Sequence, residues 1–336
     1  MTTIRWGMIG CGDVTEVKSG PAFQKAARSE LVAVMRRNGD LARDYAQRHG
    51  VPRWYDDAEA ILAAKDIDAV YIATRPDSHK DYCLKAAAAG KAVYVEKPMA
   101  MTAAQCRDMI AACETAGVPL FVAYYRRAMP YMQTIRRLLD EGRIGRPAAV
   151  QVYQAARLPV TGGGLPWRVD PAFGSGGLFF ETACHTLDIL DFLFGPVTAT
   201  RGFAANAGGA YPPEDTVAAS FSFASGVLGS GTWCFASDHD ADWASVIGTH
   251  GTLRFHPLTF QPIRLETPDG VTEIPIAPPA HVQQPLIETI VAQLNGDGSC
   301  PSTGRTAVRT AAVTEEILRD YLPGSGCKRL GRGGSG

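Results

Sequence analysis

The sequence predicts an α/β protein with two domains, a doubly wound parallel sheet followed by an α+β domain whose sheet is mainly antiparallel. Short apolar runs alternate with helical stretches through the first part of the chain, a pattern typical of parallel sheets. The first apolar run leads directly into the glycine-rich turn "GCGDVT". In the second part, strand-like runs follow one another across short turns, which favours antiparallel pairing.

Five apolar runs are the predicted strands of the first domain. They span residues 4–10, 30–35, 68–74, 92–98 and 119–125. The segments "LARDYAQRHG", "SHKDYCLKAAAAGK" and "TAAQCRDMIAACETAGV" lie between them and have the apolar spacing of helices. The last two of these segments reach Gly90 and Gly117, a residue type that commonly ends a helix.

The pattern changes after the helical segment "YMQTIRRLLDEGRIG". Strand-like runs follow, in the segments "AAVQVYQAAR", "TATRGFAAN", "TVAASFSFA", "GVLGSGTWCF", "WASVIGT" and "GTLRFH". Two late helices are predicted around "PLIETIVAQLNG" and "TAVRTAAVTEEILRDYL". The predicted domains are therefore residues 1–124 and 125–323, and the tail 324–336, which lacks apolar periodicity, is expected to be disordered.

The composition indicates a globular protein with a small-molecule partner. Its formal net charge of −1 argues against nucleic-acid or anionic-membrane binding, both of which favour a basic surface. The 8 cysteines are scattered without a C-x-x-C pair. No signal peptide and no apolar run long enough to cross a bilayer are recognisable, so we expect a cytoplasmic protein.

The glycine-rich turn is the first candidate for cofactor binding. Gly10 and Gly12 stand where a tight turn and the close approach of a pyrophosphate to a helix N-terminus require glycine. Thr15 occupies the third glycine position, which implies looser helix packing or a hydroxyl near the phosphate. A purely structural strand-to-helix turn is the alternative. The other predicted cofactor contacts in the turn are Cys11, Asp13 and Val14.

The end of the second predicted strand bears on the choice of dinucleotide. An acidic residue there commonly binds the ribose hydroxyls of NAD(H), whereas arginine accommodates the 2′-phosphate of NADP(H). This chain carries Arg36 and Arg37, so NADP(H) is favoured and NAD(H) stays possible. The alternatives are that both arginines belong to a solvated loop and that Asp40 reaches a ribose.

The chemistry is expected at the carboxyl ends of the strands, where ligands of open α/β sheets bind. Glu96, Lys97 and Pro98 follow the fourth predicted strand directly. A lysine at this edge suits proton transfer, and Glu96 is placed to orient or balance it. An ordinary exposed turn is the alternative.

A second polar group lies in the apolar segment "GGLFFETACHTLD". At helical spacing, Glu181, His185 and Asp188 fall within an arc of roughly 60° and form one stripe. We expect His185 and Glu181 to face a ligand and Asp188 to be structural. Metal ligation is not predicted, because no H-E-x-x-H motif or cysteine cluster accompanies the stripe.

Taken together, the motifs resemble a known family. They are "GCGDVT", "IATRPDSH", "VEKPM", "YYRRAMP", "LPWRVDP" and "GSGGLFFETACHTLD". In this order they resemble the glucose-fructose oxidoreductase, inositol dehydrogenase and rhizopine catabolism family (Gfo/Idh/MocA). The resemblance implies a Rossmann domain, an open-faced C-terminal sheet that joins homodimers or homotetramers, and NAD(P)-dependent oxidation or reduction of sugars, polyols or related carbonyls.

The resemblance also implies roles for individual residues. Lys97 corresponds to the family's catalytic lysine and His185 to the histidine that shares proton transfer or orients the substrate, while Glu181 stands where aspartate is usual. The Lys97-Pro98 bond is commonly cis in the family. Residues implied to contact the cofactor are Thr74, Arg75, Pro76 and His79 on the adenosine side and Trp167 and Arg168 at the nicotinamide end, with Glu96, Lys97 and Pro98 between them.

Three departures from the family pattern leave the substrate open. Arg75 stands where proline is common, Ala183 replaces a usual glycine, and Glu181 is one methylene longer than aspartate.

The hypothesis is an oxidoreductase in which Lys97 and His185 handle the hydroxyl proton and Glu181 orients the substrate. Tyr125 and Arg127 follow another strand end and are candidates for substrate or structural contacts. Two rivals keep the same fold: a nucleotide-sensing regulatory protein, and a glycosidase that uses NAD transiently.

Overall fold

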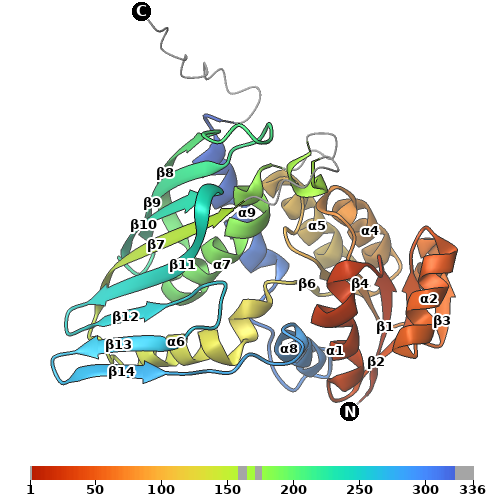
Figure 1. Cartoon of the computed structure of the whole chain (residues 1–336). Coiled ribbons are helices and arrows are strands. Elements are labelled where there is room, and N and C mark those ends of the chain that lie inside the picture. The colour runs from red at the N-terminus through yellow and green to blue at the C-terminus, as the bar shows by residue number, and fades with distance from the viewer. Residues whose placement is uncertain (1, 158–164, 171–175, 322–336) are drawn as a thin grey trace, which may run out of the picture.

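The computed structural model describes residues 2–157, 165–170 and 176–321. Two β-sheets lie side by side with helices packed on and between them (Figure 1). The predicted tail 324–336 and parts of the glycine-rich loop, residues 158–164 and 171–175, lie outside the described residues. Within the described part, no helix combines the length and apolarity needed to span a membrane.

The first sheet has six parallel strands in the order β3-β2-β1-β4-β5-β6. Its strands are β1 (Ile4–Ile9), β2 (Ser29–Met35), β3 (Arg53–Tyr55), β4 (Ala69–Ile72), β5 (Ala92–Val95) and β6 (Leu120–Val122). This order confirms the doubly wound Rossmann architecture. The edge strand β3 was not predicted, because its three residues are partly exposed and form no apolar run.

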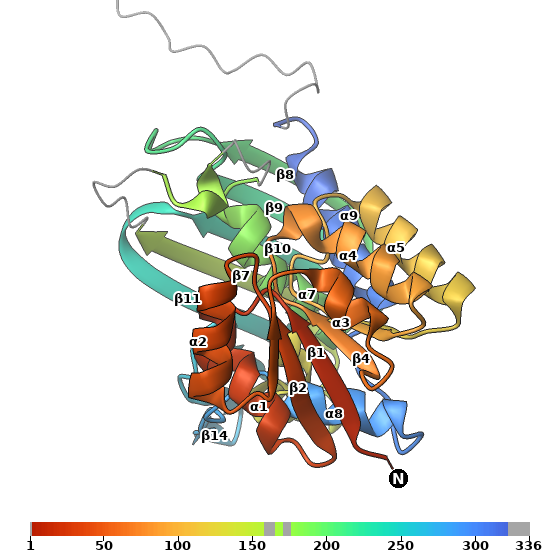
Figure 2. The ribbon, with the colours of Figure 1, turned by 90° about the vertical axis from the view of Figure 1, so that its right-hand side faces the viewer.

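Helices cover both faces of this sheet (Figure 2). They are α1 (Gly20–Lys25), α2 (Gly39–His49), α3 (Ala58–Ala63), α4 (Pro76–Ala88) and α5 (Ala103–Ala116), with the π-helical segment η1 (Thr15–Ser19) before α1. Residue types that favour the start or the end of a helix stand at the ends of these helices, as expected. Thr102 caps the start of α5 by accepting a hydrogen bond from the backbone of Gln105, and Gly117 ends that helix at a φ of 68°.

The second sheet has eight strands in the order β14-β13-β12-β11-β7-β10-β9-β8. They are β7 (Pro147–Arg157), β8 (Val197–Ala205), β9 (Thr216–Phe223), β10 (Leu228–Cys234), β11 (Ala236–Gly248), β12 (Thr252–Phe255), β13 (Ile263–Thr267) and β14 (Gly270–Ile274). Every pair is antiparallel except β7 with β10. The mainly antiparallel sheet is therefore confirmed, with β13 and β14 extending it beyond the predicted strands.

The remaining helices follow β6 in the chain and pack against one or both of the two sheets. They are α6 (Pro130–Asp140), α7 (Cys184–Phe194), α8 (Gln284–Leu294) and α9 (Gly304–Leu318), with short helical segments η2 (Tyr125–Ala128), η3 (Trp167–Val169) and η5 (Phe179–Ala183). Helices α6 and α7 pack on the second sheet. Helix α8 instead packs beside α1 in the core of the first sheet, through Leu286, Ile287 and Ile290 (Figure 1). The domain boundary at residue 124 stays a prediction.

The other face of the second sheet is largely open. Large apolar side chains are exposed on its strands, among them Phe203, Leu228, Trp243 and Ile247. Burying such side chains would be favourable, so this face is suited to covering by another surface.

Candidate active site

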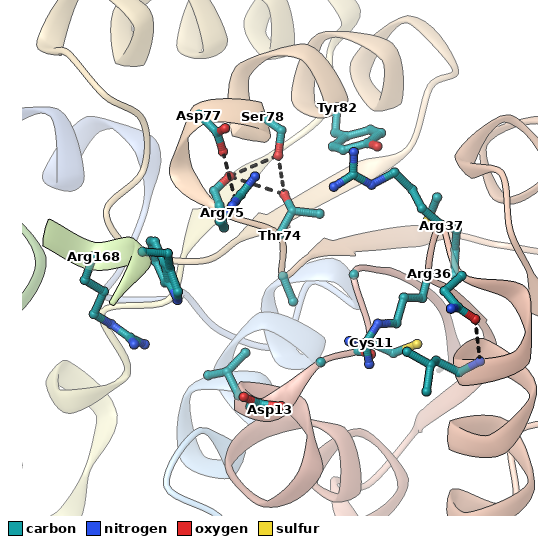
Figure 3. A pocket seen from close by; sticks show the side chains of 18 residues that line it. Cys11, Asp13, Arg36, Arg37, Thr74, Arg75, Asp77, Ser78, Tyr82 and Arg168 are labelled. Atoms are coloured by element: carbon teal, nitrogen blue, oxygen red, sulfur yellow. Dashed lines mark hydrogen bonds and ion pairs between the residues drawn. The ribbon is translucent and has the colours of Figure 1, made fainter. Parts of the chain in front are cut away.

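A cavity of about 600 Å³ lies at the carboxyl ends of β1, β2 and β4 (Figure 3). The predicted cofactor residues on its wall are Gly10, Cys11, Gly12, Asp13, Val14, Arg36, Arg37, Thr74, Arg75, Trp167 and Arg168. Lining residues that the sequence analysis missed are Met35, Asn38, Leu41, Ala73, Asp77, Ser78 and Tyr82. Most of these residues adjoin the cofactor residues already predicted at the strand ends. Extending each predicted segment by a few residues would have identified them.

The two glycines of the turn are required for different reasons. Gly10 has a φ of 96°, and a side-chain carbon there would lie 2.8 Å from the methyl carbon of Thr74. At Gly12 the nearest atom to such a carbon is 4.0 Å away, so the missing side chain leaves room on the cavity wall. Thr15 is fully buried, and its hydroxyl donates to the carbonyl oxygen of Gly12 at 2.7 Å. The Thr15 hydroxyl therefore stabilises the turn instead of facing the cavity.

The end of β2 presents cations and no carboxylate to the cavity. Arg36 and Arg37 both line it, and one guanidinium nitrogen of Arg36 lies 3.5 Å from the carbonyl oxygen of Cys11. Asp40 is turned to Arg43, with which it forms an exposed ion pair at 2.8 Å, and it is absent from the lining. Asn38 accepts a hydrogen bond from the backbone of Leu41 and caps α2. The alternative in which Asp40 reaches a ribose is thus not supported by this geometry.

His79 and Glu96 make internal contacts and do not line the cavity, contrary to the direct cofactor contact that the resemblance implies. The His79 ring is fully buried, with one nitrogen 3.0 Å from the carbonyl oxygen of Thr74 and the other 3.0 Å from that of Pro98. It therefore ties the loop after β4 to the loop after β5. Pro76, at the start of α4, is likewise buried away from the lining, and the predicted cofactor residues Lys97 and Pro98 are absent from it as well.

Glu96 belongs to a buried hydrogen-bond network behind Lys97. One carboxylate oxygen accepts from the Tyr71 hydroxyl and from the Gln283 amide, both at 2.6 Å. The other accepts from the backbone N–H of Lys97 at 3.1 Å. Glu96 thus orients the backbone of Lys97, and its contact is not with the ammonium group. The Lys97-Pro98 bond is cis.

Lys97 reaches from the first sheet to the helical segment η5. Its ammonium donates to the backbone carbonyl of Glu181 at 2.9 Å and lies 3.9 Å from a carboxylate oxygen of the same residue. The Lys97 side chain is 19% exposed and that of Glu181 only 2%. Burial raises the pKa of Glu181, while the charges of Lys97 and Arg168 oppose the rise. Since the charge of Arg168 acts on Glu181 and Arg168 also lines the cavity, this group lies toward the Arg168 end of the cavity. Figure 3 shows Arg168 on the cavity wall.

His185 completes the group. Its ring packs edge-on against Tyr124 and Tyr125, with centroids 6.1 and 5.4 Å away. Burial lowers the pKa of His185 well below its usual range, and the positive charge of Lys97 adds to this effect. Within the described part of the chain, Nδ1 of His185 and Oε1 of Glu181 are buried without a hydrogen-bond partner. Two unpartnered polar atoms beside Lys97 are suited to a polar ligand.

Asp188 has a structural role, as expected, and Arg127 shares it. The Arg127 guanidinium donates to both carboxylate oxygens of Asp188 at 2.8–3.0 Å and to Asp191 at 2.8 Å. Arg309 on α9 pairs with Asp191 at 2.7 Å. These buried ion pairs connect η2, α7 and α9 beneath the site.

The polar stripe of Glu181, His185 and Asp188 does not have the regular α-helical geometry that was predicted. Residues 179–183 form a π-helical turn before α7, so Glu181 and His185 are not related by regular α-helical spacing. Such turns are frequent at functional sites. Ala183, which replaces a usual glycine of the family, is fully buried within it. Nowhere in residues 2–157, 165–170 and 176–321 are three or more His, Cys, Asp or Glu side chains grouped so that they could hold a metal ion.

The buried neutral imidazole predicts a pH-dependent stability. The unfolded chain takes up a proton near pH 6.5 at His185 and the folded protein does not, so the contribution of His185 to the free energy of unfolding should fall below that pH, by up to about 1.4 kcal/mol per unit. The buried carboxyl of Glu214, whose pKa is raised, contributes in the opposite direction, so the effect of His185 is measured by comparison with a variant. Urea unfolding at pH 7.5, 6.5 and 5.5 measures the slope. His185→Gln should remove this contribution and change the slope by up to that amount, whereas the same change at the exposed His250 should leave the slope unchanged. Equal slopes for wild type and His185→Gln would contradict the prediction.

Two family models match the chain. The oxidoreductase family with an NAD-binding Rossmann fold (GFO_IDH_MocA) matches residues 4–124, and the GFO/IDH/MocA C-terminal domain matches residues 132–254. Oxidoreductase P35 from Formosa agariphila is 37% identical over 318 residues, which cover 94% of this chain and 97% of that protein. The 1,5-anhydro-D-fructose reductase from Ensifer adhaerens is 28% identical, over 95% of this chain and 97% of its own length.

The fold is shared with solved structures as well. An oxidoreductase from Agrobacterium radiobacter in complex with NAD+, L-tartaric acid and magnesium superposes with a TM-score of 0.84 at 23% identity, over 94% of this chain and 95% of that one. The family models cover most of the chain, including both parts of the site. The protein belongs to the Gfo/Idh/MocA family of NAD-binding oxidoreductases.

Proposed function

We propose that the protein transfers a hydride between NADP(H) and a secondary alcohol or carbonyl carbon of a sugar, polyol or related small molecule. The observation that carries the proposal is the meeting of Lys97, Glu181 and His185 at the Arg168 end of the nucleotide cavity. The named activity of the relative from Ensifer adhaerens supports a carbohydrate substrate.

The residues at the site account for the proton in this reaction. The bound nicotinamide supplies the hydride acceptor or donor. When an alcohol is oxidised, its carbon loses the hydride and its hydroxyl loses a proton, which the Lys97 side chain takes up, with His185 as hydrogen-bond partner. In the reverse direction Lys97 returns the proton to the developing alkoxide. Glu181 accepts a hydrogen bond from a neighbouring hydroxyl and orients the substrate.

The preference for NADP(H) is supported by the two arginines and by the absence of a carboxylate from the β2 end of the lining. A hydrogen bond to a charged group contributes about 1.5–3 kcal/mol, so Arg36→Ala and Arg37→Ala should each raise the Kd for NADPH by about 10- to 100-fold. The Kd for NADH should change less than threefold. A fluorescence titration of cofactor-free protein measures both constants.

Arg43→Ala is the matched control, because this exposed arginine on α2 pairs with Asp40 outside the cavity. Equal losses for NADPH and NADH in the Arg36 and Arg37 variants would overturn the NADP(H) preference. If neither NADPH nor NADH saturates the wild-type protein, the oxidoreductase proposal fails and a regulatory role becomes the better explanation. Hydrolysis of an aryl glycoside without net change in nicotinamide absorbance would replace it with glycosidase activity.

The proposal includes a cytoplasmic homodimer or homotetramer formed through the second sheet. The exposed apolar side chains Phe203, Leu228 and Ile247 on that sheet support it. Phe203→Asp with Ile247→Asp should lower the mass measured by light scattering to that of a monomer. An unchanged mass would place the contact elsewhere.

A further inference from the structure

A buried carboxylate lies at the start of the helical segment that carries Glu181. Glu214, in the connection between β8 and β9, is 2% exposed, and its Oε1 accepts a hydrogen bond from the backbone N–H of Gly177 at 2.8 Å. The backbone N–H of Phe180 is close enough to this carboxylate to lower its pKa. The first turn of a helix has N–H groups without partners inside the helix, and η5 has no side-chain cap of its own. Glu214 therefore supplies that cap from a distant part of the chain.

The glycine at position 177 permits this contact. A side-chain carbon there would collide with the backbone carbonyl oxygen of Glu214 and would also lie 2.8 Å from its carboxyl carbon, closer than such carbons approach one another. Gly176 is restricted too, because its side-chain carbon would lie 2.8 Å from Cβ of Phe180. The glycine pair before η5 is thus explained by what packs against it.

Glu214 is held by the second sheet. The carboxylate of its neighbour Asp215 accepts from the backbone N–H groups of Ala207 and Gly208 at 2.8 and 2.7 Å. The backbone of Asp215 bonds to Ala205 at the end of β8 and to Phe235 after β10. These hydrogen bonds of Asp215 fix the turn from which Glu214 extends its carboxylate.

A short series of hydrogen bonds leads from Glu214 to Lys97. The carbonyl oxygen of Gly177 accepts from the backbone N–H of Glu181 at 3.3 Å, and the carbonyl oxygen of Glu181 accepts from the Lys97 ammonium at 2.9 Å. We propose that Glu214 is a positioning residue, which holds the π-helical turn so that Glu181 meets Lys97. This inference rests on the proposed function for its effect on turnover.

Charge is not the property that this role requires. Burial raises the pKa of Glu214 to about 7, and the N–H donors of Gly177 and Phe180 oppose the rise. What the turn needs is an acceptor oxygen at this distance. A glutamine at position 214 retains that oxygen, and an alanine lacks it. An aspartate keeps the charge, but its side chain is one methylene shorter, so its oxygens lie farther from the N–H donor.

The test compares Glu214→Ala, Glu214→Gln and Glu214→Asp with wild type. Steady-state kinetics give kcat and KM, titration gives the Kd for NADPH, and the rate of Lys97 acetylation by acetic anhydride, followed by mass spectrometry, reports on the lysine without needing a substrate. The matched control is Asp57→Ala, which removes a carboxylate cap from α3 in the first domain, away from the cavity lining.

We expect Glu214→Ala to lower kcat by about 10- to 100-fold, as a misplaced catalytic group does, and to change the acetylation rate of Lys97 severalfold with the Kd for NADPH unchanged. Glutamine should restore both readouts to within threefold, and Asp57→Ala should alter neither. A Glu214→Ala variant with the kcat and the Lys97 acetylation rate of wild type would overturn the inference. A Glu214→Gln variant that behaves like Glu214→Ala would overturn it as well. If alanine prevents folding, a kcat for Glu214→Asp at or above that of Glu214→Gln would overturn it.

The proposed function can fail separately. A wild-type protein that turns over no sugar or polyol with NADP(H) contradicts that function, and the acetylation of Lys97 in the same variants still decides the role of Glu214.

Discussion

Replacing Lys97 with alanine should lower kcat by about 10³-fold, the middle of the range for loss of a positioned acid-base group. The Kd for NADPH should change little, because Lys97 is absent from the lining of the nucleotide cavity. Lys97→Arg should be similarly slow, since a guanidinium keeps the charge but does not release its proton. Stopped-flow absorbance of the nicotinamide at saturating substrate measures the hydride step.

Lys80→Ala is the control for Lys97. This lysine on α4 is partly exposed and pairs with Asp108 at 2.7 Å, outside the cavity lining. Its replacement should leave kcat unchanged. Turnover by Lys97→Ala close to that of wild type would show that another group takes the proton.

Arg127→Met should lower the free energy of unfolding by about 3–5 kcal/mol, because removing one partner of a buried pair leaves a charge without compensation. Asp188 would lose its bidentate partner, whereas Asp191 would keep Arg309. The midpoint of urea unfolding at pH 7.5 measures the loss. This is the largest effect on stability that we expect from a single substitution at the site.

Two variants separate the charge effect from lost packing. Arg137→Met removes an exposed i,i+4 pair with Glu141 at the end of α6 and should cost about 1 kcal/mol or less. Adding Asp188→Leu to Arg127→Met should recover part of the loss, because the unpaired carboxylate is then gone. A loss below 1 kcal/mol for Arg127→Met alone, or no recovery in the double variant, would contradict the explanation.

The sequence predicts the parallel sheet well because its central strands are buried on both faces. Strands β4 and β5 are therefore continuous apolar runs, and β1 is one apart from Arg5, so the residues that follow these strands, such as Gly10 and Lys97, are easily identified. Strand β14 is the opposite case. Its residues are almost all exposed, so no apolar pattern marks it.

The candidate site was predicted where a strand end or a polar stripe in an apolar helix marks its residues, and was missed where its geometry depends on packing against a distant segment. Lys97, Glu181 and His185 were identified, but the π-helical turn was not, because it is shaped by contacts with Glu214. The segment "YPPED" around Glu214 has the composition of a surface loop. Similarly, nothing local shows that the ring of His79 lies between two carbonyl groups.

The place of α8 has a consequence for synthesis on the ribosome. Its apolar face completes the core of the first sheet, yet it begins about 160 residues after β6, the last strand of that sheet. At 5–20 residues per second, the emerging sheet waits roughly 10–30 s for the helix that covers it. During that interval an apolar surface beside α1 is open to chaperones, and a chain cut before α8 keeps it open permanently.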